Sequence, residues 1–127
     1  MSRLLVVDDE ANIRLLYSEE LQDEGYEVVT AASSAEAVEK LEVGAFDLAV
    51  LDIKLKNESG IELLQKLVKE RHDMPVILSS AFSCYKDDFS AWLADGYVVK
   101  SSDLTELKQE IARVLAKKAQ KIKAAMA

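Results

Sequence analysis

Short apolar runs alternate along this chain with segments in which apolar residues recur every three or four positions. Continuous runs are typical of strands buried on both faces, and the longer spacing is typical of helices with one apolar side. The predicted strands are residues 3–7, 26–31, 46–52, 76–78 and 96–99. Helices are predicted around Ile13–Leu21, after the capping pairs Ser33–Glu36, Ser59–Glu62 and Asp103–Glu106, and, as a short element, within 83–95.

Strands and helices alternate five times, which predicts an α/β fold with one five-stranded, doubly wound parallel sheet and five helices. Right-handed crossovers place the carboxyl ends of all five strands at one edge. Residues 54–57 are expected to form a polar loop. The length of 127 residues suits one domain, expected over 1–120, with 121–127 as a helix extension or frayed tail.

Composition narrows the function classes. The net charge of −7 argues against nucleic acid or an anionic membrane as a partner of this domain. The single cysteine, Cys84, excludes an internal disulfide and a cysteine-based zinc cluster. The first apolar run is too short for a signal peptide or a membrane span, so we expect a soluble cytoplasmic protein.

Polar residues with complementary chemistry stand at the ends of the predicted strands. Asp8 and Asp9 end the first, Asp52 the third, Ser80 the fourth and Lys100 the fifth. Three carboxylates brought together repel one another, and a hard divalent cation relieves that repulsion. Mg²⁺ prefers oxygen ligands of this kind, with Mn²⁺ as an alternative.

This set of residues predicts phosphoryl transfer to a carboxylate. Asp52 is the candidate nucleophile because it stands alone at its strand end, whereas Asp8 and Asp9 are adjacent and can share the metal. Mg²⁺ and the Lys100 ammonium would neutralise the phosphoryl oxygens, and the Ser80 hydroxyl can donate to them.

Four motifs in order resemble the receiver domain of two-component response regulators, of the stand-alone type. They are the acidic run 6–10, Asp52 with Gly60 eight positions later, the segment 75–81, and the aromatic-x-x-Lys run 97–100. The resemblance extends from about residue 3 to about residue 116. It implies the flavodoxin-like strand order 2-1-3-4-5.

The resemblance also implies roles for individual residues. Asp52 would be the phospho-acceptor, and Ser80 and Lys100 would bind the phosphoryl group. Ser80 and Tyr97 would move together as a switch, although Tyr97 reads equally well as a half-buried packing residue. The metal ligands would be Asp8, Asp9, Asp52 and the backbone carbonyl of Lys54.

The implied partners follow from the same resemblance. The phosphoryl group would come from a phosphohistidine on a sensor histidine kinase or a histidine phosphotransfer protein. The domain would be a self-phosphorylating, slowly autodephosphorylating switch rather than a metabolic enzyme. Output would pass to a downstream protein through the surface of 83–95, 96–99 and the last helix. A monomer or a phosphorylation-dependent dimer is expected.

The sequence departs from the family pattern in several places. Ser101 and Lys56 stand where proline is common, and the spacing from Ser80 to Lys100 is shorter than usual. We therefore expect a different loop after Lys100 and a short or displaced helix within 83–95. Lys54 and Phe82 flank the acceptor, and their bulk is hypothesised to slow hydrolysis of the acyl phosphate.

Three rival functions remain open. A Mg²⁺-dependent phosphohydrolase with an aspartyl-phosphate usually has a second Asp two positions after the nucleophile, where this chain has Lys54. A phosphorylation-independent scaffold would not need the acidic, serine and lysine residues described above. A flavodoxin-type cofactor binder needs a Gly-rich or Ser/Thr-rich phosphate loop after the first strand, where acidic residues stand instead.

Overall fold

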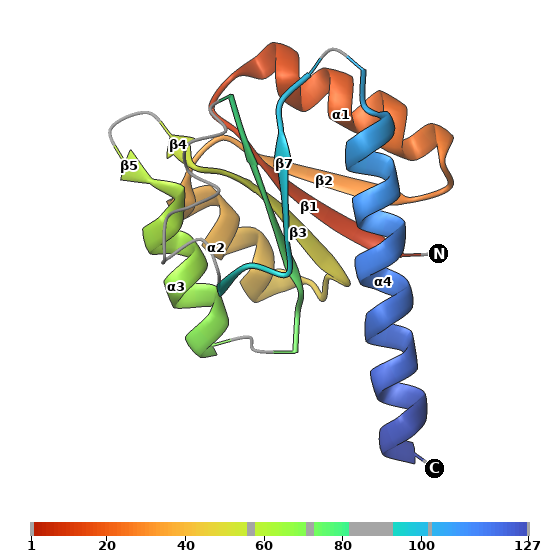
Figure 1. Ribbon diagram of the computed structural model, residues 1–127. Helices are drawn as coiled ribbons and strands as arrows, with labels where there is room; N and C mark the ends of the chain where they lie inside the picture. Colours follow the sequence, from red (N-terminus) through yellow and green to blue (C-terminus); the bar gives the residue numbers. More distant parts are fainter. Residues whose placement is uncertain (1, 56–57, 71–72, 82–92, 102, 127) are drawn as a thin grey trace.

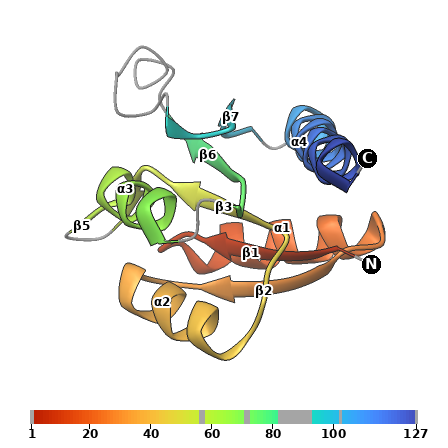
Figure 2. The ribbon, with the colours of Figure 1, turned by 90° about the horizontal axis from the view of Figure 1, so that it is seen from below.

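A five-stranded parallel sheet forms the centre of the computed structural model, which describes residues 2–55, 58–70, 73–81, 93–101 and 103–126 (Figures 1 and 2). Its strands are β1 Arg3–Val7, β2 Glu27–Ala31, β3 Leu48–Asp52, β6 Val76–Ser80 and β7 Gly96–Val99. Their order across the sheet is β2-β1-β3-β6-β7, and every neighbouring pair is parallel. The predicted doubly wound order 2-1-3-4-5 is confirmed.

Four helices are present in the described residues: α1 Ala11–Asp23, α2 Ser34–Val43, α3 Gly60–Glu70 and α4 Thr105–Met126. The fifth predicted helix, within 83–95, falls almost entirely on residues outside the described part of the chain. Phe82 and Lys56 also lie outside it.

Side chains of each strand alternate between two hydrophobic cores, one on each face of the sheet. On one face, Leu4 and Val6 of β1 pack in a cluster with Tyr17 of α1 and Leu107 of α4. On the other face, β1 and its neighbours pack against α2 and α3 through Leu41, Leu64 and similar residues. Helices therefore cover both faces of the sheet (Figure 2).

Local signals in the sequence explain where several helices begin and end. The Ser33 hydroxyl accepts a hydrogen bond from the Glu36 amide at 3.2 Å and caps α2. Gly25, just after α1, has φ of 94°, a left-handed conformation that glycine adopts without strain. The predicted start of α2 after Ser33 and the predicted stop of α1 at Gly25 are thus confirmed.

The segment predicted as a polar loop contains a short β-pair. β4 Lys54–Leu55 pairs antiparallel with β5 Glu58–Ser59. Leu55 is buried in the core beside α3, and that burial holds the segment against the domain. The prediction of a polar loop was wrong for Lys54 and Leu55, because two-residue strands leave no periodic pattern in a sequence.

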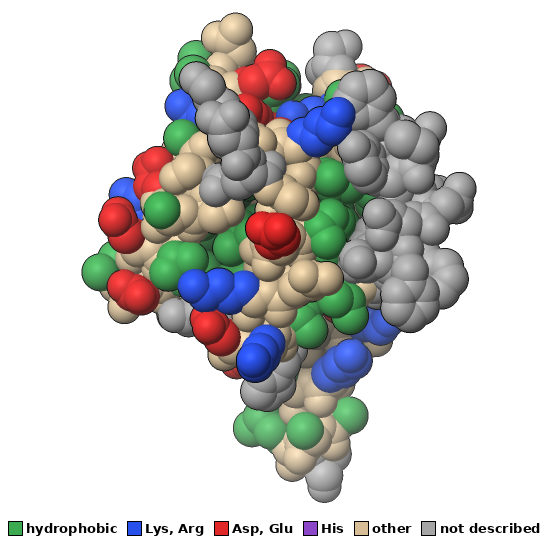
Figure 3. Space-filling model, turned by 90° about the vertical axis from the view of Figure 1, so that its left-hand side faces the viewer, with side chains coloured by type: hydrophobic (Ala, Val, Ile, Leu, Met, Phe, Trp, Pro, Cys, Tyr) green, Lys and Arg blue, Asp and Glu red, His purple; other side chains and the backbone are tan. Residues whose placement is uncertain are grey.

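Helix α4 is longer than the sheet that it covers. Its last buried side chain is Val114, whereas Ile122 and Met126 are exposed. Figure 3, which views the molecule from the side of α2 and α3, shows acidic and basic side chains interspersed over that face and the end of α4 projecting below it. None of the described helices is long and apolar enough to span a membrane.

Candidate functional site

The buried polar side chains of the described residues gather at the carboxyl edge of the sheet. Asp8, Asp52, Ser79 and Ser80 are each 5% exposed or less. Asp8 directly follows β1, Asp52 ends β3, and the two serines end β6. Lys100 follows β7 at the same edge. The parallel sheet therefore brings together the groups that the sequence placed at strand ends.

Lys100 bridges the two buried carboxylates. Its ammonium nitrogen lies 2.7 Å from Oδ2 of Asp8 and 3.1 Å from Oδ2 of Asp52. The exposed Glu10 is farther, with Oε1 at 4.0 Å. One cation thus faces two buried anions, and the cluster keeps an excess of negative charge.

The pKa values of the cluster reflect this imbalance. Burial raises the pKa of Asp52 from 3.8 to about 6; the nearby charge of Asp8 adds to the rise, and Lys100 opposes it. Burial acts to lower the pKa of Lys100, but its hydrogen bond to Asp8 and the charges of both carboxylates outweigh burial and raise it. The site therefore holds a firmly protonated lysine beside a carboxylate that is costly to ionise.

Acidic oxygens suitable for a metal lie beside Lys100. Carboxylate oxygens of Asp8, Asp9 and Glu10 lie within 4.8 Å of one another, and the Glu10 amide donates to Oδ1 of Asp8 at 2.9 Å. Asp52 reaches this group through Lys100. Hard oxygen donors with unbalanced negative charge fit Mg²⁺. Glu10 is not among the predicted metal ligands, although it is the third acid of the run.

Lys54, the remaining predicted metal ligand, lies beside Asp52. Its backbone amide donates to Oδ1 of Asp52 at 3.3 Å, and its side chain is exposed. The role predicted for Lys54 is metal ligation through its backbone carbonyl. The amide contact shows that Lys54 lies next to the Asp52 carboxyl group.

The predicted switch residues lie on neighbouring strands. Ser80 is 1% exposed, and its carbonyl accepts a hydrogen bond from the Lys100 amide at 2.6 Å. Tyr97 of β7 is half-buried and packs against the core shared with α2 and α3. After Lys100, the Ser101 hydroxyl accepts from the Asp103 amide at 3.2 Å, a local turn contact at the position where the family commonly has proline.

Gly60 fixes the start of α3 against the end of β3. Its amide donates to the Ile53 carbonyl at 2.7 Å. A Cβ atom added at Gly60 would lie 1.9 Å from the backbone oxygen of Asp52, closer than any real contact. Only glycine permits this approach, which gives a physical reason for the Asp52–Gly60 spacing.

A buried tyrosine beside the cluster escaped the sequence analysis. Tyr17 of α1 was counted as one of the apolar positions of its helix, but its hydroxyl lies 3.2 Å from the Ser79 hydroxyl, and both residues are buried. Burial raises the pKa of Tyr17; the Ser79 hydrogen bond and Lys100 oppose the rise, and the charges of Asp8 and Asp52 add to it. The tyrosine hydroxyl is therefore within electrostatic reach of the site.

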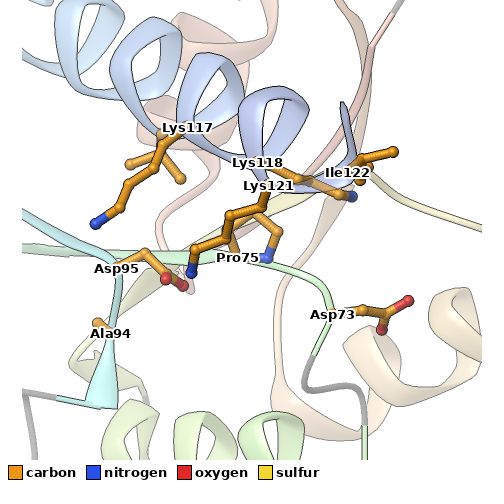
Figure 4. A pocket seen from close by; sticks show the side chains of 9 residues that line it. Asp73, Pro75, Ala94, Asp95, Lys117, Lys118, Lys121 and Ile122 are labelled. Atoms are coloured by element: carbon orange, nitrogen blue, oxygen red, sulfur yellow. The ribbon is translucent and has the colours of Figure 1, made fainter. Parts of the chain in front are cut away.

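A cavity of about 520 Å³ lies away from this site, at the amino edge of the sheet (Figure 4). Pro75 and Asp95, at the starts of β6 and β7, line it together with Lys117, Lys118 and Lys121 of α4. The cavity shares no residue with the carboxyl-edge cluster, so the concave surface and the buried charges belong to different ends of the domain.

Comparison with known sequences points to one family. Residues 4–112 match the family model of the response regulator receiver domain. The chain is 34% identical over 117 residues to the heme response regulator HssR of Staphylococcus saprophyticus, covering 91% of this chain and 52% of that protein. It is 31% identical over 123 residues to the response regulator ArlR of Staphylococcus aureus, covering 95% of this chain and 56% of that protein. The chain spans about half the length of these relatives.

Solved structures agree with this fold. The response regulator TrrA of Thermotoga maritima, in complex with Mg²⁺ and BeF, is 47% identical with a TM-score of 0.86, over 90% of this chain and 99% of that one. TrrA in complex with the histidine kinase ThkA is 48% identical with a TM-score of 0.85, over 91% of this chain and 99% of that one. The match covers most of the chain and agrees with its strand order. This chain therefore belongs to the response regulator receiver domain family.

Proposed function

We propose that this domain accepts a phosphoryl group on Asp52 in a Mg²⁺-dependent reaction and passes the change to a partner protein. The observation that carries the proposal is the Lys100 bridge between Asp8 and Asp52 at the carboxyl edge. A buried carboxylate held beside one ammonium and an acidic group supports aspartyl-phosphate formation, in which a carboxylate attacks and positive charges stabilise the phosphoryl oxygens.

The transfer would form one bond at Asp52 and break one bond in the donor. An Asp52 carboxylate oxygen forms the new bond to phosphorus while the bond from phosphorus to the donor's imidazole nitrogen breaks. The nitrogen keeps the electron pair and takes up a proton from solvent. Lys100 and the Ser80 hydroxyl stabilise the charge on the phosphoryl oxygens. Before transfer, the Lys54 amide and Lys100 hold the two Asp52 oxygens in place.

Four groups would hold the metal: the carboxylates of Asp8, Asp9 and Asp52 and the backbone carbonyl of Lys54. Mg²⁺ supplies the positive charge that one lysine leaves uncompensated among these carboxylates. Glu10 adds negative charge to the same corner of the site without being assigned as a ligand.

The proposed donor is a phosphohistidine on a sensor histidine kinase or a histidine phosphotransfer protein. The TrrA–ThkA complex supports this class of partner, because TrrA is 48% identical to this chain. The domain would act as a switch that phosphorylates itself and hydrolyses slowly, with Lys54 and Phe82 restricting water. Ser80 and Tyr97 would alter the surface around β7 and α4, which a downstream protein would read.

Intact mass after incubation with acetyl phosphate tests the proposal directly. We expect a gain of one phosphoryl group that requires Mg²⁺ and is absent in Asp52→Asn. Lys100→Met should slow the gain by about 100-fold or more, because the phosphoryl charge loses its counter-ion.

Asp47→Asn is the matched control, since it makes the same chemical change just before the amino end of β3. Its Oδ2 accepts a hydrogen bond from the Arg3 amide, which an asparagine oxygen can also accept. This variant should be phosphorylated like the native protein. A folded native protein that binds Mg²⁺ but gains no phosphate would contradict the proposal and favour the scaffold function.

A further inference from the structure

The Tyr17–Ser79 pair is a buried polar contact between a helix and the end of a strand. The two hydroxyl oxygens are 3.2 Å apart, and each residue is 2% exposed. Tyr17 belongs to an apolar cluster with Val6, Ile77 and Val98. A buried hydroxyl without a partner is costly, so the two hydroxyls depend on each other.

The pair lies next to the acceptor in the sheet. In the register of β3 and β6, Ser79 is the direct partner of Asp52, and the Ser79 carbonyl accepts from the Ile53 amide at 3.4 Å. Ser79 also directly precedes Ser80, whose carbonyl accepts from the Lys100 amide. A sideways shift of Ser79 therefore moves both the acceptor strand and the residue that holds Lys100.

The other member of the pair is anchored to the acidic run. Helix α1 begins at Ala11, directly after Glu10, and Arg14 donates to the Asp8 carbonyl at 2.8 Å. Tyr17 stands one turn farther along the same helix. The Tyr17–Ser79 contact thus joins the helix that follows the acidic residues to the strand that carries Ser80.

We propose that Tyr17 and Ser79 are positioning residues that hold the end of β6 in register with Asp52, so that phosphoryl transfer to Asp52 depends on their hydrogen bond. The inference rests on the proposed function. Neither hydroxyl touches the transferred group, and both act through the placement of Asp52, Ser80 and Lys100. Tyr97 of β7 is the register partner of Leu78 and packs against the core on the opposite face of the sheet.

A double-mutant cycle tests the pair with acetyl phosphate at saturating Mg²⁺. Tyr17→Phe and Ser79→Ala should each lower the maximal phosphorylation rate constant by about 3- to 10-fold, the equivalent of one hydrogen bond. The double variant should be no slower than the slower single variant, because the two hydroxyls act as one unit. The acetyl phosphate concentration at half-maximal rate should stay unchanged.

Two isosteric variants separate the hydroxyl from the volume of the side chain. Ser79→Thr keeps a hydroxyl and should retain a rate near that of the native protein, whereas Ser79→Val should be as slow as Ser79→Ala. Unfolding free energies of all variants, measured in urea, show whether a rate change exceeds a general loss of stability.

Several results would overturn the inference. Equal maximal rates in native protein and folded Tyr17→Phe would leave the pair with only a structural role, as would equally slow Ser79→Thr and Ser79→Val. Rate losses that multiply in the double variant would show two independent contributions. If the native protein takes up no phosphate, the proposed function fails and this inference fails with it. If the native protein and the variants are phosphorylated at equal rates, only this inference fails.

Discussion

The two edges of the sheet use carboxylates in opposite ways. At the carboxyl edge, Asp8 and Asp52 are buried and share the single ammonium of Lys100. At the amino edge, Asp47 and Asp95 are more exposed, and each accepts a hydrogen bond from the backbone amide of a strand residue, at 2.8 and 2.9 Å.

This difference separates carboxylates that satisfy backbone amides from carboxylates that crowd around one ammonium. At the amino edge each aspartate satisfies an amide at the start of a strand, and the lysines around the cavity remain in contact with solvent. At the carboxyl edge, burial and mutual repulsion leave the charges of Asp8 and Asp52 incompletely balanced. An incoming cation or phosphoryl group can interact strongly with such a site.

The largest effect is expected where glycine allows the start of α3 to approach the backbone of Asp52. Gly60→Ala should lower the free energy of unfolding by about 4 kcal/mol, because its Cβ would lie 1.9 Å from the Asp52 oxygen. Gly96→Ala at the amino edge is the matched change. Its Cβ would meet the flexible Glu110 side chain at 3.0 Å, so the cost should be about 1 kcal/mol or less.

Urea unfolding of both variants, with circular dichroism as the signal, measures the two costs. If the two substitutions prove equally mild, α3 can move away from Asp52 and the carboxyl edge is no more tightly packed than the amino edge. Slower phosphorylation of folded Gly60→Ala would further indicate that the packing of α3 positions the acceptor.

The next effect concerns pH. The folded protein holds a proton on Asp52 more tightly than the unfolded chain, because its pKa is raised from 3.8 to about 6. The resulting stability is fully present below the unfolded pKa and is lost as pH rises through the folded pKa. Relative to native protein, Asp52→Asn should therefore gain up to about 3 kcal/mol of unfolding free energy between about pH 4 and pH 7.

Urea titrations of the two proteins across this range, with a chelator present, measure the difference. Parallel pH profiles would mean that Asp52 ionises as easily in the folded protein as in the unfolded chain. The proposed contrast between the two edges would then lose its electrostatic basis.

The smallest effect concerns a hydroxyl that is near the carboxyl edge but outside the cluster. Ser33 follows β2 and caps α2 by accepting from the Glu36 amide. Ser33→Ala should lower the free energy of unfolding by about 1 kcal/mol and leave the phosphorylation rate unchanged. A marked loss of phosphorylation in this variant would extend the functional edge as far as β2.

Much of the fold could be predicted from the sequence because apolar runs and helical spacing mark the five main strands and four of the helices. Strand boundaries were less certain. The predicted strand 46–52 begins at Leu48 in the structure, and Asp47 bonds to Arg3 through both its amide and its carboxylate. The β4–β5 pair was missed because it depends on the burial of Leu55.

The site could be predicted only in part, for a similar reason. Asp8, Asp52, Ser80 and Lys100 stand at strand ends, so topology alone brings them to one edge. Tyr17 and Ser79 gave no such signal, because a tyrosine in an apolar stripe and a serine in a strand each have an ordinary explanation. The two hydroxyls meet only once α1 is packed on the sheet and β6 is in register with β3.

Helix α4 combines two degrees of local stability in one continuous element. Its first turns bury Leu107, Ile111 and Val114, so their amides can exchange with solvent only when much of the domain opens. The turns beyond Val114 have little core beneath them, and an isolated helix of about 12 residues is marginal in water. Their amide hydrogens can therefore exchange through local fraying while the sheet and the aspartate cluster remain intact.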